Sequence, residues 1–316
     1  MEGFHLCPVQ SFYQQVLLPV AYTTVFFLGF GLNGGLLWSV FSQTRHRSNM
    51  IIYLSNLAVA DLLFVLSLAP LIISNAMGDL WPFGDAICKV TRFLYFVNLH
   101  CSMLFLACVG AHRFVGACYP LRAVHIKTRK FAFIASTSLW AVATAEISPT
   151  LYFSHTGVIN NMTVCYEMVG PGQFKAYFPY SLFLAIVGFL VPLVVVVVCY
   201  CCVLRVLYRG TPNLSGISTS DRDWRNKSLR TLVVVVLLFF ICFLPYHVAR
   251  TVYVFVRVYR PGDCELLNIV MISYKVWKPV VSVNCCVNPL LYFWGSADHR
   301  TRLRAWLGRN RIQPRV

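Results

Sequence analysis

Five basic side chains lie within, or at one end of, long apolar stretches of the sequence: Arg92, His247, Arg250, Lys275 and Lys278. A charge is costly inside hydrocarbon, so an ionisable residue there indicates a functional site. Several cations together suit a ligand with several negative charges, and the planar fork of arginine suits phosphate. The residues therefore predict an anion-binding site.

The spacing of these residues supports a shared site. His247, Arg250 and Arg257 recur at helical spacing, so they share one helical face. Lys275 and Lys278 lie about one helical turn apart. Aromatic residues that offer walls for a planar ligand occur in the same or neighbouring stretches; they are Tyr95, Phe96, Tyr177, Tyr180, Tyr246, Tyr253 and Tyr274. We expect a pocket with cationic and aromatic walls.

The composition indicates that a membrane surrounds the elements that position these residues. The chain has 316 residues, of which 58% are hydrophobic and 12% are charged, whereas a soluble domain is about 25% charged. A helix needs about 20 apolar residues to span a membrane, and seven apolar runs are this long. They are Val16–Phe41, Met50–Ala76, Ala86–Cys118, Phe131–Phe153, Lys175–Tyr208, Ser228–Val258 and Leu266–Trp294. The predicted fold is an all-α membrane protein, a bundle of seven transmembrane helices.

The basic residues predict the orientation of this bundle. Most of the 27 lysines and arginines lie in one alternate set of connections and in the C-terminal tail, and such segments face the cytoplasm. We expect a single domain over 1–316, with an extracellular N-terminus at 1–15, the helix bundle at 16–294 and a cytoplasmic tail at 295–316. The tail predicts a short amphipathic helix over Ala297–Leu307. The chain is thus predicted to be a multi-pass plasma-membrane protein in contact with lipid.

The formal net charge of +16 does not indicate nucleic-acid binding, because the topology segregates the basic residues and no single soluble face gathers them.

Of the 13 cysteines, Cys7, Cys88, Cys165 and Cys264 are predicted to face the oxidising side. Four cysteines permit three pairings, which the sequence leaves open. Asn161 begins a glycosylation sequon in a predicted outer loop.

Polar residues within the spans carry a resemblance. The sequence has Gly31-Leu-Asn33 in the first span, Leu57-Ala-Val-Ala-Asp61 in the second, Cys88 at the head of the third, Trp140 in the fourth, and Asn288-Pro-Leu-Leu-Tyr292 in the seventh. At these spacings the chain resembles the rhodopsin-like (class A) G-protein-coupled receptors over nearly its whole length. As a set, these motifs are very specific.

The resemblance implies three further sites. Asp61, Ser102, Asn284 and Asn288 would line an internal sodium and water site. A cytoplasmic switch that admits a heterotrimeric G protein would be formed by Arg113, Tyr200 and Tyr292. Cys88 and Cys165 would form the bridge that ties the third span to the second outer loop.

Two motifs depart from the pattern of this family. The usual Asp-Arg-Tyr is His112-Arg113-Phe114, so the acid that restrains the arginine is missing. In the sixth span Phe243 replaces the usual tryptophan. The first departure leaves the level of basal activity open.

A narrower resemblance concerns the ligand. Cys242-Phe-Leu-Pro-Tyr-His247-Val-Ala-Arg250, followed by Tyr274-Lys275-Val-Trp-Lys278, looks like the metabotropic purinergic receptors for extracellular nucleotides. The resemblance implies that Arg92, Arg250 and Lys278 contact phosphates and that His247 shapes the site. It also implies a Cys7–Cys264 bridge and a pairing of Glu167 with a cation of the seventh span. Lys278 stands where arginine is usual, and Phe96 where tyrosine is frequent.

The sequence thus predicts a receptor for extracellular uridine or adenine di- or triphosphates that signals through the phospholipase-C and calcium route. The expected ligand contacts are Arg92, Phe96, Tyr180, His247, Arg250, Tyr274, Lys275 and Lys278. A receptor for small carboxylates such as succinate or 2-oxoglutarate is the alternative, and a transporter is a more distant one. No enzymatic constellation is visible, and no cofactor is expected apart from an allosteric sodium ion. The base, the number of phosphates, the G-protein subtype and the oligomeric state stay open.

Overall fold

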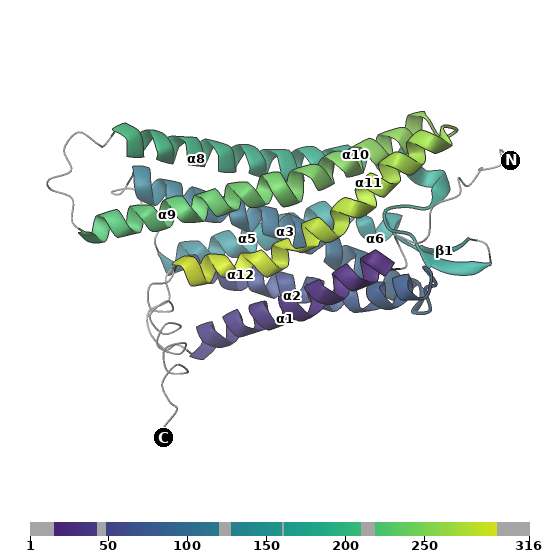
Figure 1. Ribbon diagram of the computed structural model, residues 1–316, viewed down its shortest axis with the longest axis horizontal. Coiled ribbons are helices and arrows are strands. Elements are labelled where there is room, and N and C mark those ends of the chain that lie inside the picture. Colours follow the sequence, from purple (N-terminus) through teal and green to yellow (C-terminus); the bar gives the residue numbers. More distant parts are fainter. Residues whose placement is uncertain (1–15, 43–48, 120–127, 160, 210–218, 296–316) are drawn as a thin grey trace, which may run out of the picture.

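The computed structural model describes residues 16–42, 49–119, 128–159, 161–209 and 219–295, and in these residues the chain forms an elongated bundle of helices (Figure 1). The first four spans are α1 (Leu18–Ser42), α2 (Asn49–Ala76), α3 (Gly84–Cys118), and α5 (Arg129–Ile147) with the short α6 (Thr150–Phe153). The fifth is η2 (Pro171–Gln173), α7 (Phe174–Phe183), η3 (Leu184–Leu190) and α8 (Val191–Arg209). The sixth is α9 (Thr219–Leu238), η5 (Phe239–Phe243) and α10 (Leu244–Tyr259), and the seventh is α11 (Cys264–Ser282) with α12 (Asn284–Gly295).

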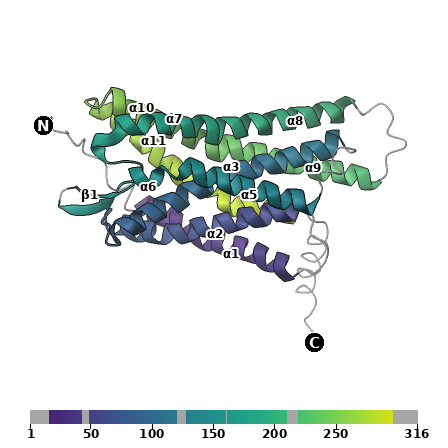
Figure 2. The same ribbon diagram turned by 180° about the vertical axis from the view of Figure 1, so that it is seen from behind.

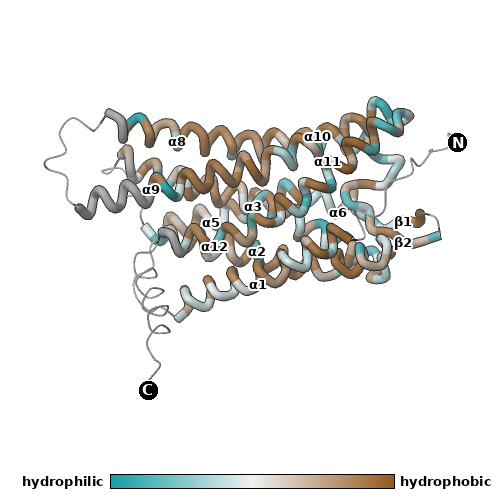
Figure 3. The backbone as a smooth tube through the Cα atoms, viewed as in Figure 1, coloured by the Kyte–Doolittle hydropathy of each residue, from teal (hydrophilic) through white to brown (hydrophobic). Residues whose placement is uncertain are grey.

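Seven of these helical segments are long and apolar enough to cross a membrane, which confirms the predicted fold class. The helices consist of apolar residues along most of their length (Figure 3). Large apolar side chains face outward, among them Trp38 at 77% exposure and Phe27 at 69%. Such a surface is unfavourable in water and suits lipid tails. The predicted helix at Ala297–Leu307 and the predicted N-terminal segment 1–15 lie outside the described residues.

Polar side chains tie neighbouring helices together inside the bundle. The Asn33 amide donates to the carbonyl of Cys285 at 2.8 Å, which joins α1 to α12. The Trp140 indole donates to Asn56 Oδ1 at 3.2 Å, which joins α5 to α2. Because such N–H groups find no water in hydrocarbon, they donate to acceptors within the protein.

The fifth, sixth and seventh spans are irregular near their prolines. The wide π-helical segments η3 and η5 end just before Pro192 and Pro245. Pro279 lies inside α11, and Val283 separates α11 from α12. Proline lacks the backbone N–H that a regular helix needs, so the regular α-helical bonding is interrupted near these positions.

A β-hairpin that was not predicted from the sequence extends from one end of the bundle (Figures 1 and 2). β1 (Thr156–Ile159) pairs antiparallel with β2 (Met162–Cys165), with Thr156 opposite Cys165. The Asp85 carboxylate on α3 accepts a bond from the backbone of Thr156 at 2.8 Å. Asn161 turns the hairpin with a positive φ of 62° and is exposed, so its glycosylation stays a prediction.

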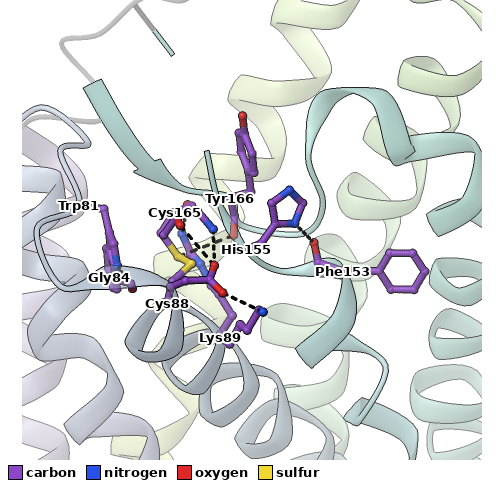
Figure 4. Close-up of a disulfide and its surroundings, with 11 residues drawn as sticks. Trp81, Gly84, Cys88, Lys89, Phe153, His155, Cys165 and Tyr166 are labelled. Carbon is purple, nitrogen blue, oxygen red and sulfur yellow. Dashed lines mark hydrogen bonds and ion pairs between the residues drawn. A yellow bond between two sulfur atoms is a disulfide. The ribbon is translucent and has the colours of Figure 1, made fainter. Parts of the chain in front are cut away.

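The hairpin is also bonded covalently to the bundle. Cys88 near the start of α3 forms a disulfide with Cys165 at the end of β2 (Figure 4), which confirms the predicted pairing. Cys264 at the start of α11 is disulfide-bonded, and Cys7 lies outside the described residues. The residues that follow Cys165 are thereby held over this end of the bundle.

Candidate ligand-binding site

A cavity of about 260 Å³ lies where the hairpin meets the ends of α1, α2, α3, α10 and α11. Four basic side chains line it: Arg92, Arg257, Lys275 and Lys278. Two carboxylates, Asp79 and Glu167, line it as well. Four cations against two acids leave the cavity with an excess of positive charge, so it suits an anion.

Glu167, two residues after the disulfide-bonded Cys165, contacts two side chains of the seventh span in the cavity. Its Oε1 lies 2.5 Å from Lys278 Nζ and accepts a hydrogen bond of 2.5 Å from the Tyr274 hydroxyl. The expected pairing with a seventh-span cation therefore forms at Lys278. Lys278 also faces the rings of Tyr22, Tyr95 and Tyr274 at 5.7 to 6.0 Å.

The charge state of Glu167 follows from these partners. Burial raises the pKa of its carboxyl, but Lys278, Arg92 and the Tyr274 hydroxyl outweigh burial and hold that pKa at about 2, against an ordinary value of 4.5. A depressed pKa contributes stability above pH 4.5 that is lost as pH falls toward about 2. Near neutral pH the carboxylate is therefore charged, and a ligand must compete with it for Lys278.

Arg92 and Arg257 are the arginines of the cavity. Arg92 Nη2 donates to the carbonyl of Cys165 at 3.1 Å, and its Nε has no hydrogen-bond partner among the described residues. The guanidinium of Arg257 lies 5.3 Å from the ring centre of Phe174. Arg257 shares a helical face with Arg250 in the sequence, but it was not among the predicted ligand contacts.

The predicted ligand contacts fall into two groups. Arg92, Tyr274, Lys275 and Lys278 line the cavity together. Phe96, Tyr180, His247 and Arg250 do not line it, and they lie in a layer among α3, α7, η3 and α10 in which Tyr180 is half-buried and the other three are buried. The His247 ring stacks on Phe189 at 4.4 Å, and the Tyr180 hydroxyl donates to the carbonyl of Glu146 at 3.0 Å.

One buried histidine–carboxylate contact in this layer had no signal in the sequence. His100 Nδ1 on α3 lies 3.0 Å from Glu146 Oε2 on α5, with side chains 0% and 7% exposed. A methyl group at Gly188 of η3 would collide with the His100 ring. Neither residue belongs to a motif, so only the fold brings them together.

A second polar site surrounds Asp61 in the middle of the bundle. Its carboxylate is fully buried and accepts bonds from the amides of Asn98 at 2.8 Å and Asn288 at 3.0 Å. Ser102 is buried beside the same carboxylate. Asn284 borders a void of about 10 Å³, about the space of one water. Asn98 was not predicted, although it lies one turn from Ser102 on the same face of α3.

The three predicted switch residues lie toward the opposite end of the bundle from the hairpin. Arg113 is near the end of α3, Tyr200 is in α8, and Tyr292 is near the end of α12. These helices run in the same direction, so their ends share one face of the bundle (Figure 1). His112, which replaces the usual acid, packs its ring against Tyr53 with centroids 5.9 Å apart.

A seven-helix bundle with a disulfide-tethered loop over an internal cavity and a buried polar core defines a class of membrane receptor. The model of the 7 transmembrane receptor (rhodopsin family) matches residues 32–292 of the chain.

Individual relatives narrow this class. Purinoceptor 3 of Meleagris gallopavo is 36% identical over 303 residues, which cover 96% of this chain and 92% of the relative. Purinoceptor 4 of Homo sapiens is 38% identical over 98% of this chain and 83% of its own length. Purinoceptor 6 of Homo sapiens is 35% identical over 94% of this chain and 90% of its own length. The chain therefore belongs to the purinoceptors of the rhodopsin family, multi-pass plasma-membrane receptors coupled to G proteins, and it is not an enzyme.

Proposed function

We propose that the chain is a receptor for extracellular nucleotides and that the cavity beside the hairpin binds their phosphates. The observation that supports this proposal is the gathering of Arg92, Arg257, Lys275 and Lys278 in one cavity. Phosphate is the common biological anion that suits several cations at once, and arginine binds it through two parallel bonds. The purinoceptors among the relatives favour the same ligand class.

The aromatic walls of the cavity supply the second half of a nucleotide site. Tyr253 and Tyr274 stack with ring centres 5.7 Å apart and planes 6° apart, and both line the cavity. Phe174 lines it from α7. Flat aromatic faces suit a base in the way that cations suit its phosphates.

The proposed orientation puts the N-terminus and the hairpin outside the cell and the C-terminus in the cytoplasm. The basic connections support this orientation. In it the cavity opens to extracellular ligand, Asn161 is open to glycosylation, and Arg113, Tyr200 and Tyr292 face a heterotrimeric G protein. The ligand biases the bundle by binding one arrangement more tightly than another, and lipid is the surrounding partner.

Calcium mobilisation in transfected cells tests the proposed function. Uridine and adenine di- and triphosphates are compared with succinate and 2-oxoglutarate at matched surface expression, with mock-transfected cells as the control. We expect a response to at least one nucleotide and none to the dicarboxylates. A receptor that answers only dicarboxylates would refute the proposal.

We also infer that Asp61 holds a sodium ion. Asn288 Oδ1 is buried beside this carboxylate and has no hydrogen-bond partner within the described residues. A buried charge is normally paired or coordinates a metal, and oxygen donors suit a hard cation. Asp61, Ser102, Asn284 and Asn288 would hold the ion, which would supply the positive charge that the carboxylate lacks.

Replacing Asp61 by asparagine tests the sodium site. Purified wild-type receptor should gain about 1.4 kcal/mol when sodium exceeds its dissociation constant about tenfold, and Asp61→Asn should gain nothing. Thermal unfolding in sodium chloride and in choline chloride measures the difference. Ser67→Ala is the matched control on α2, because the Ser67 hydroxyl bonds only within its own helix, to Phe64, in the described structure. An equal sodium effect in wild type and Asp61→Asn would exclude the site.

A further inference from the structure

Arg250 is a buried cation whose charge is poorly compensated. The residue is 2% exposed, and its Nη2 donates to the Tyr177 hydroxyl at 2.5 Å. Among the described residues no carboxylate forms an ion pair with it, and its Nε has no hydrogen-bond partner. A buried charge without a counter-charge is costly. Arg250 is therefore held in a state that an anion would stabilise.

Aromatic rings supply the rest of its surroundings. The guanidinium carbon lies 5.3 Å from the ring centre of Phe96 and 6.0 Å from that of Tyr177. Ring faces attract a cation, but less strongly than an anion does. The positive charge of Arg250 is thus stabilised by a neutral hydroxyl and two rings, which attract it less strongly than an anion would.

Tyrosines close Arg250 off from the ligand cavity. Tyr246 and Tyr253 lie one turn on either side of it on α10, and Tyr274 of α11 packs against both, with ring centres 5.7 Å apart in each pair. Tyr253 and Tyr274 line the cavity, whereas Arg250 does not. The Tyr253–Tyr274 stack therefore forms cavity wall on the helical turn next to the buried arginine.

The stack is connected to the ligand contacts of the cavity. The Tyr274 hydroxyl donates to Glu167 Oε1, the same oxygen that pairs with Lys278. A phosphate that takes Lys278 competes with Glu167, and a displaced Glu167 no longer holds Tyr274. Anion binding in the outer cavity thereby loosens the wall in front of Arg250.

Tyr177 is held by packing against neighbouring aromatic rings. Its side chain is 2% exposed. Its ring packs edge-on against Phe153, with centroids 5.2 Å apart, and edge-on against Tyr180 at 5.6 Å. The bond between Tyr177 and Arg250 must therefore break before the guanidinium reaches the cavity.

We propose that Tyr177 is an affinity-determining latch: its hydroxyl retains Arg250 behind the Tyr253–Tyr274 stack, and a polyphosphate ligand must take Arg250 from it. The latch rests on the proposed function, because it requires that the ligand of the cavity be an anion. It sets affinity by competition, because each interaction that stabilises the closed arrangement is lost on binding.

Replacing Tyr177 by phenylalanine tests the latch, because it removes the hydroxyl and keeps the ring. Nucleotide affinity of the purified full chain should rise about tenfold or more, the lower end of the range for one charge-assisted hydrogen bond. In an Arg250→Met background the same substitution should change affinity less than about twofold, because no arginine remains to be released. Tyr177→Leu, which also lacks the hydroxyl, repeats the test if the phenylalanine variant does not reach the membrane.

Tyr152→Phe is the matched control, since Tyr152 is 75% exposed next to Phe153. It should leave affinity unchanged. Unchanged or weaker binding in Tyr177→Phe, or an equal gain without Arg250, would overturn the latch. Inorganic pyrophosphate serves as a second probe. Pyrophosphate binding that tightens in Tyr177→Phe while no nucleotide binds supports the latch and refutes the nucleotide function. If neither anion binds the wild type, both proposals are wrong.

Discussion

Replacing Arg92 by alanine is expected to lower nucleotide potency at least about tenfold while the receptor still reaches the cell surface. A charge-assisted hydrogen bond to a buried group is worth about 1.5 to 3 kcal/mol, and Arg92 offers the cavity a fork of such donors. Among the described residues it donates a single hydrogen bond, of 3.1 Å, to the carbonyl of Cys165. The loss should therefore fall on the ligand more than on the fold. Calcium concentration–response curves normalised to surface staining measure it.

Lys89→Ala is the matched control for this substitution. Lys89 lies one turn before Arg92 on α3, is 36% exposed and pairs with Asp85 at 2.7 Å. It has the same sign of charge on the same helix but does not line the cavity. Arg92→Lys keeps the charge but removes the planar fork of donors. Its nucleotide potency should lie between those of the wild type and Arg92→Ala. Full potency in Arg92→Ala would mean that the arginine only supports the hairpin.

The bundle was predictable because each span has a one-dimensional signature. The length of an apolar run is set by the thickness of the bilayer, and six of the seven spans begin and end within a few residues of the predicted runs. The sixth differs, because its polar start from Thr219 is helical and adds nine residues before the predicted Ser228. The polar set around Asp61 was predictable for a related reason, since few polar residues occur in a span and each must face the interior. The hairpin of β1 and β2 was missed because four-residue strands carry too little periodic signal.

The ligand site was only partly predictable, because the sequence gives the face of a helix but not its rotation or depth. His247, Arg250 and Arg257 do share a face of α10, yet the cavity reaches Arg257 and stops short of Arg250. Which seventh-span lysine meets Glu167 depends on the path of the loop after Cys165. That path is fixed by the disulfide and the hairpin register, which are three-dimensional constraints.

Lys278→Met is expected to abolish the nucleotide response and also to reduce the amount of receptor at the surface. Removing one partner of a buried ion pair costs about 3 to 5 kcal/mol. Glu167 is 23% exposed, and this access to water lowers our expectation to about 2 to 3 kcal/mol. The Tyr274 hydroxyl and Arg92 remain near the carboxylate and limit the damage further. Surface staining and thermal unfolding of the purified variant measure the structural part of the loss.

The double variant Lys278→Met/Glu167→Gln separates the two roles of this lysine. A neutral glutamine needs no cation, so surface expression should return close to wild type. The nucleotide response should stay lost, because a phosphate still lacks its cation. Glu167→Gln alone should keep or increase potency, since Lys278 is then free for the ligand without competition. A double variant that recovered both expression and response would show that Lys278 serves only to neutralise Glu167, and phosphate binding would then rest on the arginines alone.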